Sequence, residues 1–251
     1  MIAVGANVSR GSWFAVRIEG SVARRADARL FPNLSLLVDS WGDASQILLG
    51  MPIGLPDAEQ PTRQVDHEAR RLLRPLRANT VFPVPSRAAI DAFRSGEARS
   101  YQALSKTNQL EVHRKLSRQS AGMVRKIAEV DELLTRDPAL HDKVREAHRE
   151  ICFWGLNHAQ PMSYPKARTE GVAERLDVIG QYIPWARTFF EKVERQFGGR
   201  VPQAVITDAL GTALTAVPAH PLLGDLLSIP TQPQRDARGL RMEMVYRLPR
   251  V

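Results

Sequence analysis

The pattern of hydrophobic and polar positions at the start of the chain, two mostly apolar runs around a polar turn, predicts the first strands of a β-sheet. Residues 2–8 and 13–18 are rich in β-branched and aromatic side chains, and the turn-forming run Ser9-Arg10-Gly11-Ser12 separates them. A hairpin is the expected structure. The elements expected after it are a strand at residues 22–28, a helix that starts at Pro32-Asn33 and an apolar strand at residues 45–51.

Helical spacing dominates the charged middle of the chain. Residues 61–74 carry Arg63, Asp66, His67 and Arg70 on one helical stripe, and Pro75 is expected to stop that helix. The prolines within residues 81–85 require extended backbone there. Further helices are expected at residues 88–116, broken near Gly96, and at residues 121–134.

The last part of the chain predicts one more strand and several helices. Residues 143–148 favour a short strand that runs into a helix at residues 150–157, although residues 146 and 150 also share a helical face. The other expected elements are helices at 171–181, 184–197 and 203–217 and a β-rich segment at 241–247. The predicted fold class is α/β, with a mixed sheet flanked by helices.

Composition narrows the class of protein. The 251 residues are 43% hydrophobic and 25% charged, which predicts a globular chain of one domain. A formal net charge of +8 favours polyanionic partners without locating the attraction. Cys152 is the single cysteine, and its apolar surroundings predict a buried packing residue in a cytoplasmic protein. No run of about 18 apolar residues occurs, so no membrane partner is expected.

Ten short phrases, spread over residues 2–247, occur in the order used by one known family. On these phrases the chain resembles the predicted nuclease family of RNase H-like fold found in bacteria and archaea. The phrases are Gly5 through Trp13, Pro52-Ile53-Gly54-Leu55-Pro56, Arg63-x-x-Asp66-x-x-x-Arg70-Arg71, Val81-Phe82-Pro83-x-Pro85, Ser117-Arg118-Gln119, Lys126-Ile127-x-Glu129-Val130-Asp131, Glu146-x-His148-x-Glu150, Phe153-Trp154-x-Leu156-Asn157, Lys166-x-x-Thr169-x-Gly171-x-x-x-Arg175 and Gly239-Leu240-x-Met242-Glu243-x-Val245-Tyr246.

The chain departs from this family at the expected metal site. The resemblance implies an aspartate where the chain has Asn7, another in place of Gly50, and a third on the last helix in place of Gly211. Nucleases of this fold hold divalent metal with clustered carboxylates, which balance its charge and place it to activate water. Asparagine supplies an oxygen without charge and glycine supplies no side chain, so these degenerate positions predict a weakened centre.

Two acids remain as candidates near that centre. Asp208 lies one helical turn before Gly211 on a similar face, and Glu150 follows the predicted strand at residues 143–148. Asp43 precedes Gly50 by a distance on the order of 23 Å along a strand, and therefore belongs to the other end of the sheet. Two carboxylates and an asparagine would hold one Mg²⁺ only weakly.

Glu146, His148 and Glu150 recur with a period of two, so on a strand all three would project from one face. One interpretation is a metal or acid/base cluster, in which His148 changes charge near neutral pH. The other is a surface strand of alternating polarity, since arginines interleave at positions 145 and 149. The sequence leaves both interpretations open.

The stripe at residues 61–74 has the side chains that bind an anion. Arginine forks bind phosphate oxygens in pairs, so Arg63 and Arg70 are candidate ligands, with Asp66 orienting one of them. A solvated helix face that carries its own ion pairs is the alternative.

Two later sets of residues extend this prediction. Ser117 and Gln119 either cap a helix or contact a ligand, with capping the commoner role for serine. Lys166, Thr169 and Arg175 lie in and after a loop, where binding residues concentrate. A loop lysine followed by an arginine on the next helix suits an anionic ligand.

The expected protein is a single RNase H-like domain over residues 1–251, with a helical elaboration at about residues 61–135. It is expected to bind nucleic acid or a phosphorylated small molecule without efficient Mg²⁺-dependent hydrolysis. One alternative is an active nuclease whose Mg²⁺ or Mn²⁺ site is rebuilt from Glu150 and Asp208. A second is metal-free chemistry with His148 as base and Glu146 or Glu150 orienting it. A purely structural partner of another protein is the third.

Overall fold

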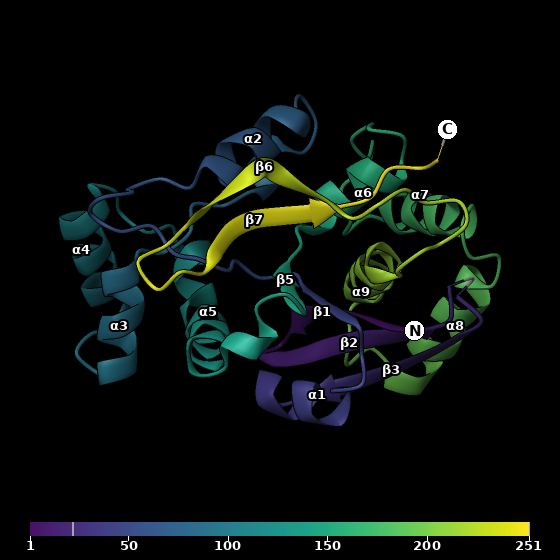
Figure 1. Ribbon diagram of the computed structural model, residues 1–251, viewed down its shortest axis with the longest axis horizontal. Helices are drawn as coiled ribbons and strands as arrows, with labels where there is room; N and C mark the ends of the chain where they lie inside the picture. Colours follow the sequence, from purple (N-terminus) through teal and green to yellow (C-terminus); the bar gives the residue numbers. More distant parts are fainter. Residues whose placement is uncertain (22, 251) are drawn as a thin grey trace.

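The main sheet has five strands in the order β3-β2-β1-β4-β5 in the computed structural model, which describes residues 1–21 and 23–250. The first three strands form an antiparallel meander, and β4 and β5 extend the sheet parallel to β1 (Figure 1). Because β1 and β4 are parallel neighbours, their carboxyl ends meet at one edge of the sheet. The strands are β1 (Ile2–Ser9), β2 (Ser12–Glu19), β3 (Arg25–Phe31), β4 (Gln46–Leu49) and β5 (Val144–Glu146).

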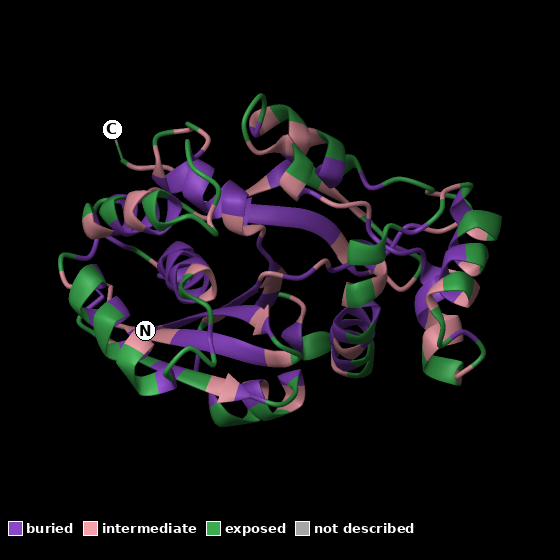
Figure 2. Ribbon diagram, turned by 180° about the vertical axis from the view of Figure 1, so that it is seen from behind, coloured by how far each residue is buried: buried purple, intermediate pink, exposed green. Residues whose placement is uncertain are grey.

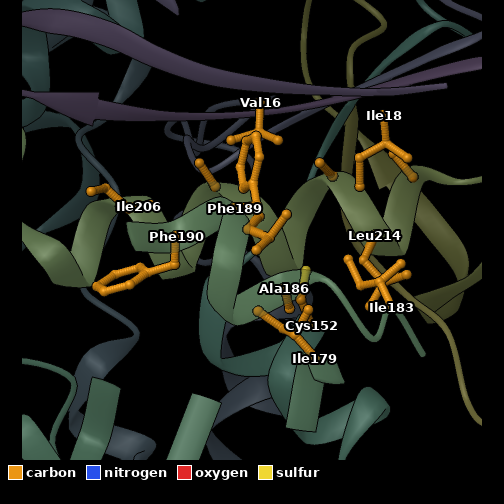
Figure 3. Packing of buried hydrophobic residues seen from close by; sticks show 14 of the residues in the cluster. Val16, Ile18, Cys152, Ile179, Ile183, Ala186, Phe189, Phe190, Ile206 and Leu214 are labelled. Atoms are coloured by element: carbon orange, nitrogen blue, oxygen red, sulfur yellow. The ribbon is translucent and has the colours of Figure 1, made fainter. Parts of the chain in front are cut away.

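One face of the sheet is covered by four helices, of which α9 lies closest. A Cβ atom at Gly5 of β1 would lie 2.1 Å from the backbone nitrogen of Ala213 in α9, so only glycine permits this approach. Figure 3 shows Val16 and Ile18 of β2 pointing from the sheet into the apolar layer that these helices form. The helices are α6 (Arg149–Leu156), α7 (Thr169–Gly180), α8 (Ala186–Phe197) and α9 (Gln203–Ala216).

The opposite face packs against α1 and α5, and α3 and α4 pack in turn against α5. Apolar residues that recur at helical spacing within the helix predicted at residues 121–134 explain this contact, because Ile127, Val130 and Leu134 lie on one face of it and are all buried. Figure 2 shows the inner strands of the main sheet largely buried between the two helical layers, while β3 at the sheet edge and the outer faces of the helices carry exposed residues. The helices are α1 (Leu34–Ser40), α3 (Arg87–Ser95), α4 (Tyr101–Val112) and α5 (Arg118–Arg136).

A hairpin of two strands forms a second, small sheet. It packs against α2 and α6, where Val65, Trp154 and Met244 belong to a third apolar cluster. Figure 1 shows this hairpin next to α2, in a layer separate from the main sheet. The elements are α2 (Gln64–Leu72), β6 (Leu227–Arg235) and β7 (Arg241–Tyr246), with short 3-10 turns η1 (Ala78–Thr80) and η2 (Pro138–Leu140) elsewhere.

The predicted fold class is confirmed. The described residues form an α/β fold in which nine helices flank a mixed five-stranded sheet, an arrangement consistent with an RNase H-like fold. Four of the helices, α2 to α5, lie between β4 and β5 in the chain. Cys152 is fully buried as expected, and burial raises the pKa of its thiol to about 12.

Two predicted elements differ in the structure, and one strand was not predicted. The third strand is displaced from residues 22–28 to Arg25–Phe31, and Val22 lies outside the described residues. The helical segment expected at residues 88–116 is broken at Gly96 as predicted, but its second helix ends at Val112, before His113, a residue with a φ of 53°. Strand β6 was not expected because its two prolines remove backbone donors, which only a strand with an unpaired edge or a bulge tolerates.

Candidate anion-binding site

Asn7 and Gly50 stand side by side at the carboxyl ends of β1 and β4. The parallel register continues past β4, since the Gly50 N–H donates to the Ala6 carbonyl at 2.8 Å. The Asn7 side chain is buried, and its Nδ2 donates to Thr212 Oγ1 of α9 at 3.4 Å. Its Oδ1 occupies the space next to Gly50, where a Cβ atom would lie only 1.9 Å away. The Asn7 amide therefore occupies the space that a side chain at residue 50 would need.

Two adjoining cavities lie at these strand ends, where open α/β sheets bind ligands. The larger, of about 200 Å³, is lined by Asn7, Lys126, Lys166 and Asp208 among others. The smaller, of about 150 Å³, is lined by residues that include Arg63, Asp66, Phe82, Gln119 and His148. Both share Gly50, Met51, Met123 and Arg149, so one ligand can reach into both.

A wider hollow of about 870 Å³ lies beside α3 and α5, away from the strand ends. Some of its charges are engaged in ion pairs: Arg238 contacts Asp91 at 2.8 Å and the neighbouring Asp131 at 2.6 Å, and Arg94 contacts Asp131 at 3.4 Å. Among the described residues, no buried polar atom without a partner lines this hollow, whereas four such atoms line the strand-end cavities. We therefore place the candidate site at the strand ends.

Asp208 is the acid of the larger cavity and is compensated by two cations. It lies on α9, is 1% exposed, and accepts a hydrogen bond from Lys166 Nζ through Oδ2. Arg149 Nε lies 3.8 Å from the same oxygen, while Oδ1 has no partner among the described residues. Burial lowers the pKa of Lys166, an effect that the neighbouring Asp208 opposes. The carboxylate and the ammonium thus form a partly buried ion pair.

Glu150 and Arg175 form an internal ion pair instead of lining a cavity. The Arg175 Nη2 donates to both carboxylate oxygens of Glu150, at 2.7 and 3.0 Å. Arg175 is fully buried, also donates to the Gly171 carbonyl at 2.9 Å, and stacks on Phe153. The prediction that Arg175 presents its charge to an anion is therefore wrong, because that charge is used to join α7 to α6.

Glu146 is likewise occupied by the protein. Its Oε2 accepts from Arg63 Nη2 and from the Ile53 N–H, the latter at 2.7 Å. Arg63 is 2% exposed and also donates to the Ile53 carbonyl at 3.1 Å, so the helix stripe does not present this arginine to solvent. Burial raises the pKa of Glu146 to about 8, and Arg63 opposes that rise. This pair anchors the loop after β4.

Asp66 and Arg70 lie one turn apart on α2 and have different surroundings. Asp66 is buried, lines the smaller cavity, and accepts from Arg63 Nη1 at 3.3 Å through Oδ1. Its Oδ2 receives no hydrogen bond from the described residues. Arg70 donates twice to the Val81 carbonyl, at 3.1 and 2.9 Å, which holds the loop that contributes Phe82 to the same cavity.

The expectation that Glu146, His148 and Glu150 project from one strand face is wrong. Strand β5 ends at Glu146, His148 is the residue before α6, and Glu150 lies in the first turn of that helix. Their side chains contact Arg63, the Thr80 carbonyl and Arg175 respectively. A change from strand to helix within five residues breaks the period of two, and the three groups do not converge.

His148 serves as a hydrogen-bond acceptor in the smaller cavity. Its Nε2 lies 3.2 Å from the Thr80 carbonyl, which only accepts, so the ring proton is assigned to Nε2. Its Nδ1 then carries a lone pair, and this atom is buried without a partner among the described residues. Burial lowers the pKa of His148 to about 3, with Arg149 as a second cause. An imidazole of this kind is a weak base at neutral pH.

Arg149 is the functional candidate that sequence reasoning missed. Its side chain is 23% exposed, lines both cavities, and makes no hydrogen bond with the described residues. It is also the first residue of α6, whose amino end adds partial positive charge at this point. In the sequence Arg149 resembles the outward charge of an alternating strand. The signal in the sequence that could have identified Arg149 was its position at the start of an apolar helix.

The remaining predicted anion ligands are spread around the site. Ser117 caps α5, where its Oγ accepts from the Ser120 N–H at 3.0 Å. Gln119 is exposed and lines the smaller cavity. Thr169 is exposed at the start of α7 and lines neither cavity. Lys166 lines the larger cavity, as described above, so Lys166 and Gln119 are the members of this set that line a cavity, each a different one.

Gly211 does not belong to the site. A Cβ atom at this position would lie 2.7 Å from Phe153 Cζ, inside the apolar core between α9 and α6. The interpretation of Gly211 as a lost metal ligand is therefore wrong, because a carboxylate there would enter the core. Asp208, one turn earlier on α9, is the position that faces the strand ends. Asp43 pairs with Arg17 at 3.0 Å and lines neither cavity.

Over residues 1–21 and 23–250, no three His, Cys, Asp or Glu side chains are grouped closely enough to share a metal ion. Over the same residues, no helix combines the length and the apolar character needed to span a bilayer.

The fold and the site together define an α/β protein, consistent with an RNase H-like arrangement, that has two cavities lined by basic and acidic side chains at its strand ends. The chain belongs to the family described as Protein of unknown function (DUF429), whose family model matches residues 8–235. No curated protein and no solved structure matches the chain.

Proposed function

We propose that the protein binds a phosphate ester in the two strand-end cavities, without efficient Mg²⁺-dependent hydrolysis. Arg149 is the observation that carries this proposal. It is a guanidinium at the junction of both cavities whose hydrogen bonds the protein leaves unused. An arginine guanidinium binds two phosphate oxygens at once, so a phosphate would accept hydrogen bonds from the N–H groups of Arg149 that the described residues leave unused.

The balance of charge around the larger cavity supports an anionic ligand. Arg149 and Lys166 both approach Asp208, so two cations compensate one carboxylate. Lys126 also lines this cavity, although its Nζ donates to Glu129 at 2.7 Å. A phosphate between Arg149 and Lys166 would be attracted by this excess positive charge and receive charge-assisted hydrogen bonds.

The side chains at the strand ends do not fit a doubly charged metal ion. Such an ion takes several oxygen ligands, and catalytic sites supply most of its compensating charge as carboxylates. Here Asp208 is already paired with Lys166, Glu150 with Arg175, and Glu146 with Arg63. Metal-dependent hydrolysis is therefore not part of the proposed function. The resemblance to nucleases supports the location of the site but not a nuclease reaction there.

The size of the cavities favours one phosphate group and its ester over a duplex. Volumes of about 200 and 150 Å³ accept a small molecule or a single nucleotide of a strand. A phosphorylated small molecule is the preferred ligand, and single-stranded nucleic acid is the other ligand to test.

The proposal is tested by calorimetric titration of ribose 5-phosphate, and of a fluorescein-labelled single-stranded oligonucleotide by anisotropy, both in EDTA. The Arg149→Gln variant is expected to weaken phosphate binding roughly 10- to 100-fold, the range for a lost charge-assisted hydrogen bond. Arg195→Gln removes an exposed arginine of α8 that lines neither cavity, and should leave affinity unchanged. Absence of binding by both probes, or equal affinity in Arg149→Gln, would overturn the proposal.

Hydrolysis is tested separately with nucleic acid substrates in Mg²⁺ or Mn²⁺. We expect no cleavage above the level of a catalyst-free control. Metal-dependent cleavage that disappears in Asp208→Asn would instead support the active nuclease with a rebuilt site.

A further inference from the structure

The smaller cavity offers hydrogen-bonding groups of both kinds at its inner end. His148 Nδ1 is a buried acceptor without a partner, and Asp66 Oδ2 is a second acceptor that no described residue uses. Arg63 also lines this cavity, and its Nε–H is a buried donor without a partner. An unpaired buried polar group is unfavourable, so His148 Nδ1 and Arg63 Nε at one place indicate a ligand that pairs with them, and Asp66 Oδ2 is an additional acceptor for it.

The walls of the same cavity are apolar and adaptable. Met51, Phe82, Val84, Met123 and Met244 line it. Methionine sulfurs make favourable contacts with aromatic rings, and their flexible side chains adjust to a flat group. A planar heterocycle suits this combination of apolar walls and a polar inner end, because its faces are apolar while its edge carries both N–H donors and ring acceptors.

The two cavities meet at Arg149 and at the backbone of Gly50. Both residues line both cavities. A heterocycle in the smaller cavity and a phosphate between Arg149 and Lys166 in the larger one would thus be parts of one molecule.

We infer that the ligand is a nucleoside monophosphate, with its base in the cavity of His148, Asp66 and Arg63 and its phosphate at Arg149 and Lys166. This inference rests on the proposed function and adds the chemical class of the ligand. Nothing in it requires a reaction, since every contact is a hydrogen bond, an ion pair or an apolar contact.

The first experiment compares ligands on the wild-type protein by calorimetry in EDTA. The panel contains the four common ribonucleoside 5′-monophosphates, ribose 5-phosphate and the corresponding nucleosides. At least one monophosphate is expected to bind tenfold or more tightly than ribose 5-phosphate and than its own nucleoside. If ribose 5-phosphate binds as tightly as every monophosphate, the inference fails while the proposed function stands. If no phosphate ester binds, both fail.

Two variants test where the base lies. Val84→Trp, at a residue that lines only the smaller cavity, fills that cavity and should reduce the affinity for the preferred monophosphate to that for ribose 5-phosphate, which itself should be unchanged. Leu110→Trp adds the same indole at a position of α4 that is 73% exposed, and should change neither affinity. Asp66→Asn keeps the shape of the side chain but replaces one acceptor by a donor, and should weaken the monophosphate at least tenfold.

A single-stranded oligonucleotide distinguishes a free nucleotide from a nucleotide within a strand. Binding of the oligonucleotide tenfold or more tightly than any monophosphate would overturn the assignment to a mononucleotide. Equal loss of ribose 5-phosphate and monophosphate binding in a folded Val84→Trp protein would also overturn it, because the base would then make no separate contact. Thermal melting of each variant verifies folding.

Discussion

The side-chain oxygen of Asn7 occupies the space in which residue 50 would carry its Cβ atom, at a distance of 1.9 Å. The positions on neighbouring parallel strands are therefore coupled, and a side chain at residue 50 requires Asn7 to rotate away. Rotation would break the hydrogen bond from Asn7 Nδ2 to Thr212 Oγ1. Asparagine at one position and glycine at the other are thus compatible choices.

Substitution Gly50→Ala should lower the free energy of unfolding by about 1–3 kcal/mol, the usual effect of overpacking. In an Asn7→Ala background the same change should have much less effect, because the obstructing amide is gone. Urea unfolding of the four proteins of this double-mutant cycle measures the coupling. Gly122→Ala is a matched control, because Gly122 of α5 has open space around it and alanine favours helix by about 1 kcal/mol. Additive effects at residues 7 and 50 would contradict the coupling.

Gly211→Ala should also destabilise the protein, here by forcing a methyl group against Phe153 at 2.7 Å. We expect a loss of about 1–3 kcal/mol in urea unfolding. Phe153→Leu should reduce the additional effect of Gly211→Ala, since the smaller side chain leaves room. Gly180→Ala, at the open end of α7, provides the control without a steric contact. A neutral Gly211→Ala variant would show that α9 and α6 are not in this close contact.

The Arg175–Glu150 ion pair should be more important to stability than any exposed pair. Arg175→Met leaves the Glu150 carboxylate buried without a partner, and should lower the free energy of unfolding by about 3–5 kcal/mol. Arg175→Met combined with Glu150→Gln removes the unpaired charge and should recover part of this loss. Arg187→Met is the control: its pair with Asp177 has both side chains more than half exposed, and typical exposed pairs contribute about 0–1 kcal/mol. Similar losses at residues 175 and 187 would refute the prediction.

The lowered pKa of His148 makes stability depend on acid pH. The folded protein holds His148 neutral down to a pKa of about 3, whereas the unfolded chain titrates near the ordinary value of about 6.5. Between these values the unfolded state binds the extra proton, so stability is full above about pH 6.5 and falls as pH decreases.

Urea unfolding between pH 7 and 4 should therefore show wild type losing up to about 1.4 kcal/mol per pH unit more than His148→Gln below pH 6. His113→Asn changes an exposed histidine and should leave the wild-type slope unchanged. Parallel slopes for wild type and His148→Gln would contradict the neutral, buried imidazole.

Local pattern predicted most of the strands and helices because each depends on neighbours in the sequence. The β1–β2 hairpin follows from its turn residues, and the α5 stripe of Ile127, Val130 and Leu134 follows from helical periodicity. Strand β6 escaped prediction because its prolines exclude it from the interior of a sheet, and only pairing with β7 at an edge permits it.

The sequence indicated where the candidate site lies, but not which side chains line it. The resemblance placed it at Asn7 and Gly50, and helical spacing placed Asp208 near them. The same reasoning put Arg63 and Arg175 on a binding face, although both are buried against acids. It also passed over Arg149, since nothing local distinguishes an arginine that faces a cavity from one that faces solvent.

By itself, the sequence determined the α/β class, the burial of Cys152 and the scarcity of acids at the ends of β1 and β4, because these depend on composition, periodicity and residue identity. Only the tertiary structure decided which charges neutralise one another and which stay available to a ligand. Arg63 meets Glu146 across 83 positions of chain, and Lys166 meets Asp208 across 42. Coulomb attraction and desolvation depend on distance and burial in space, so only the folded chain decides that Arg149 lies 3.8 Å from Asp208 and makes no hydrogen bond with the described residues.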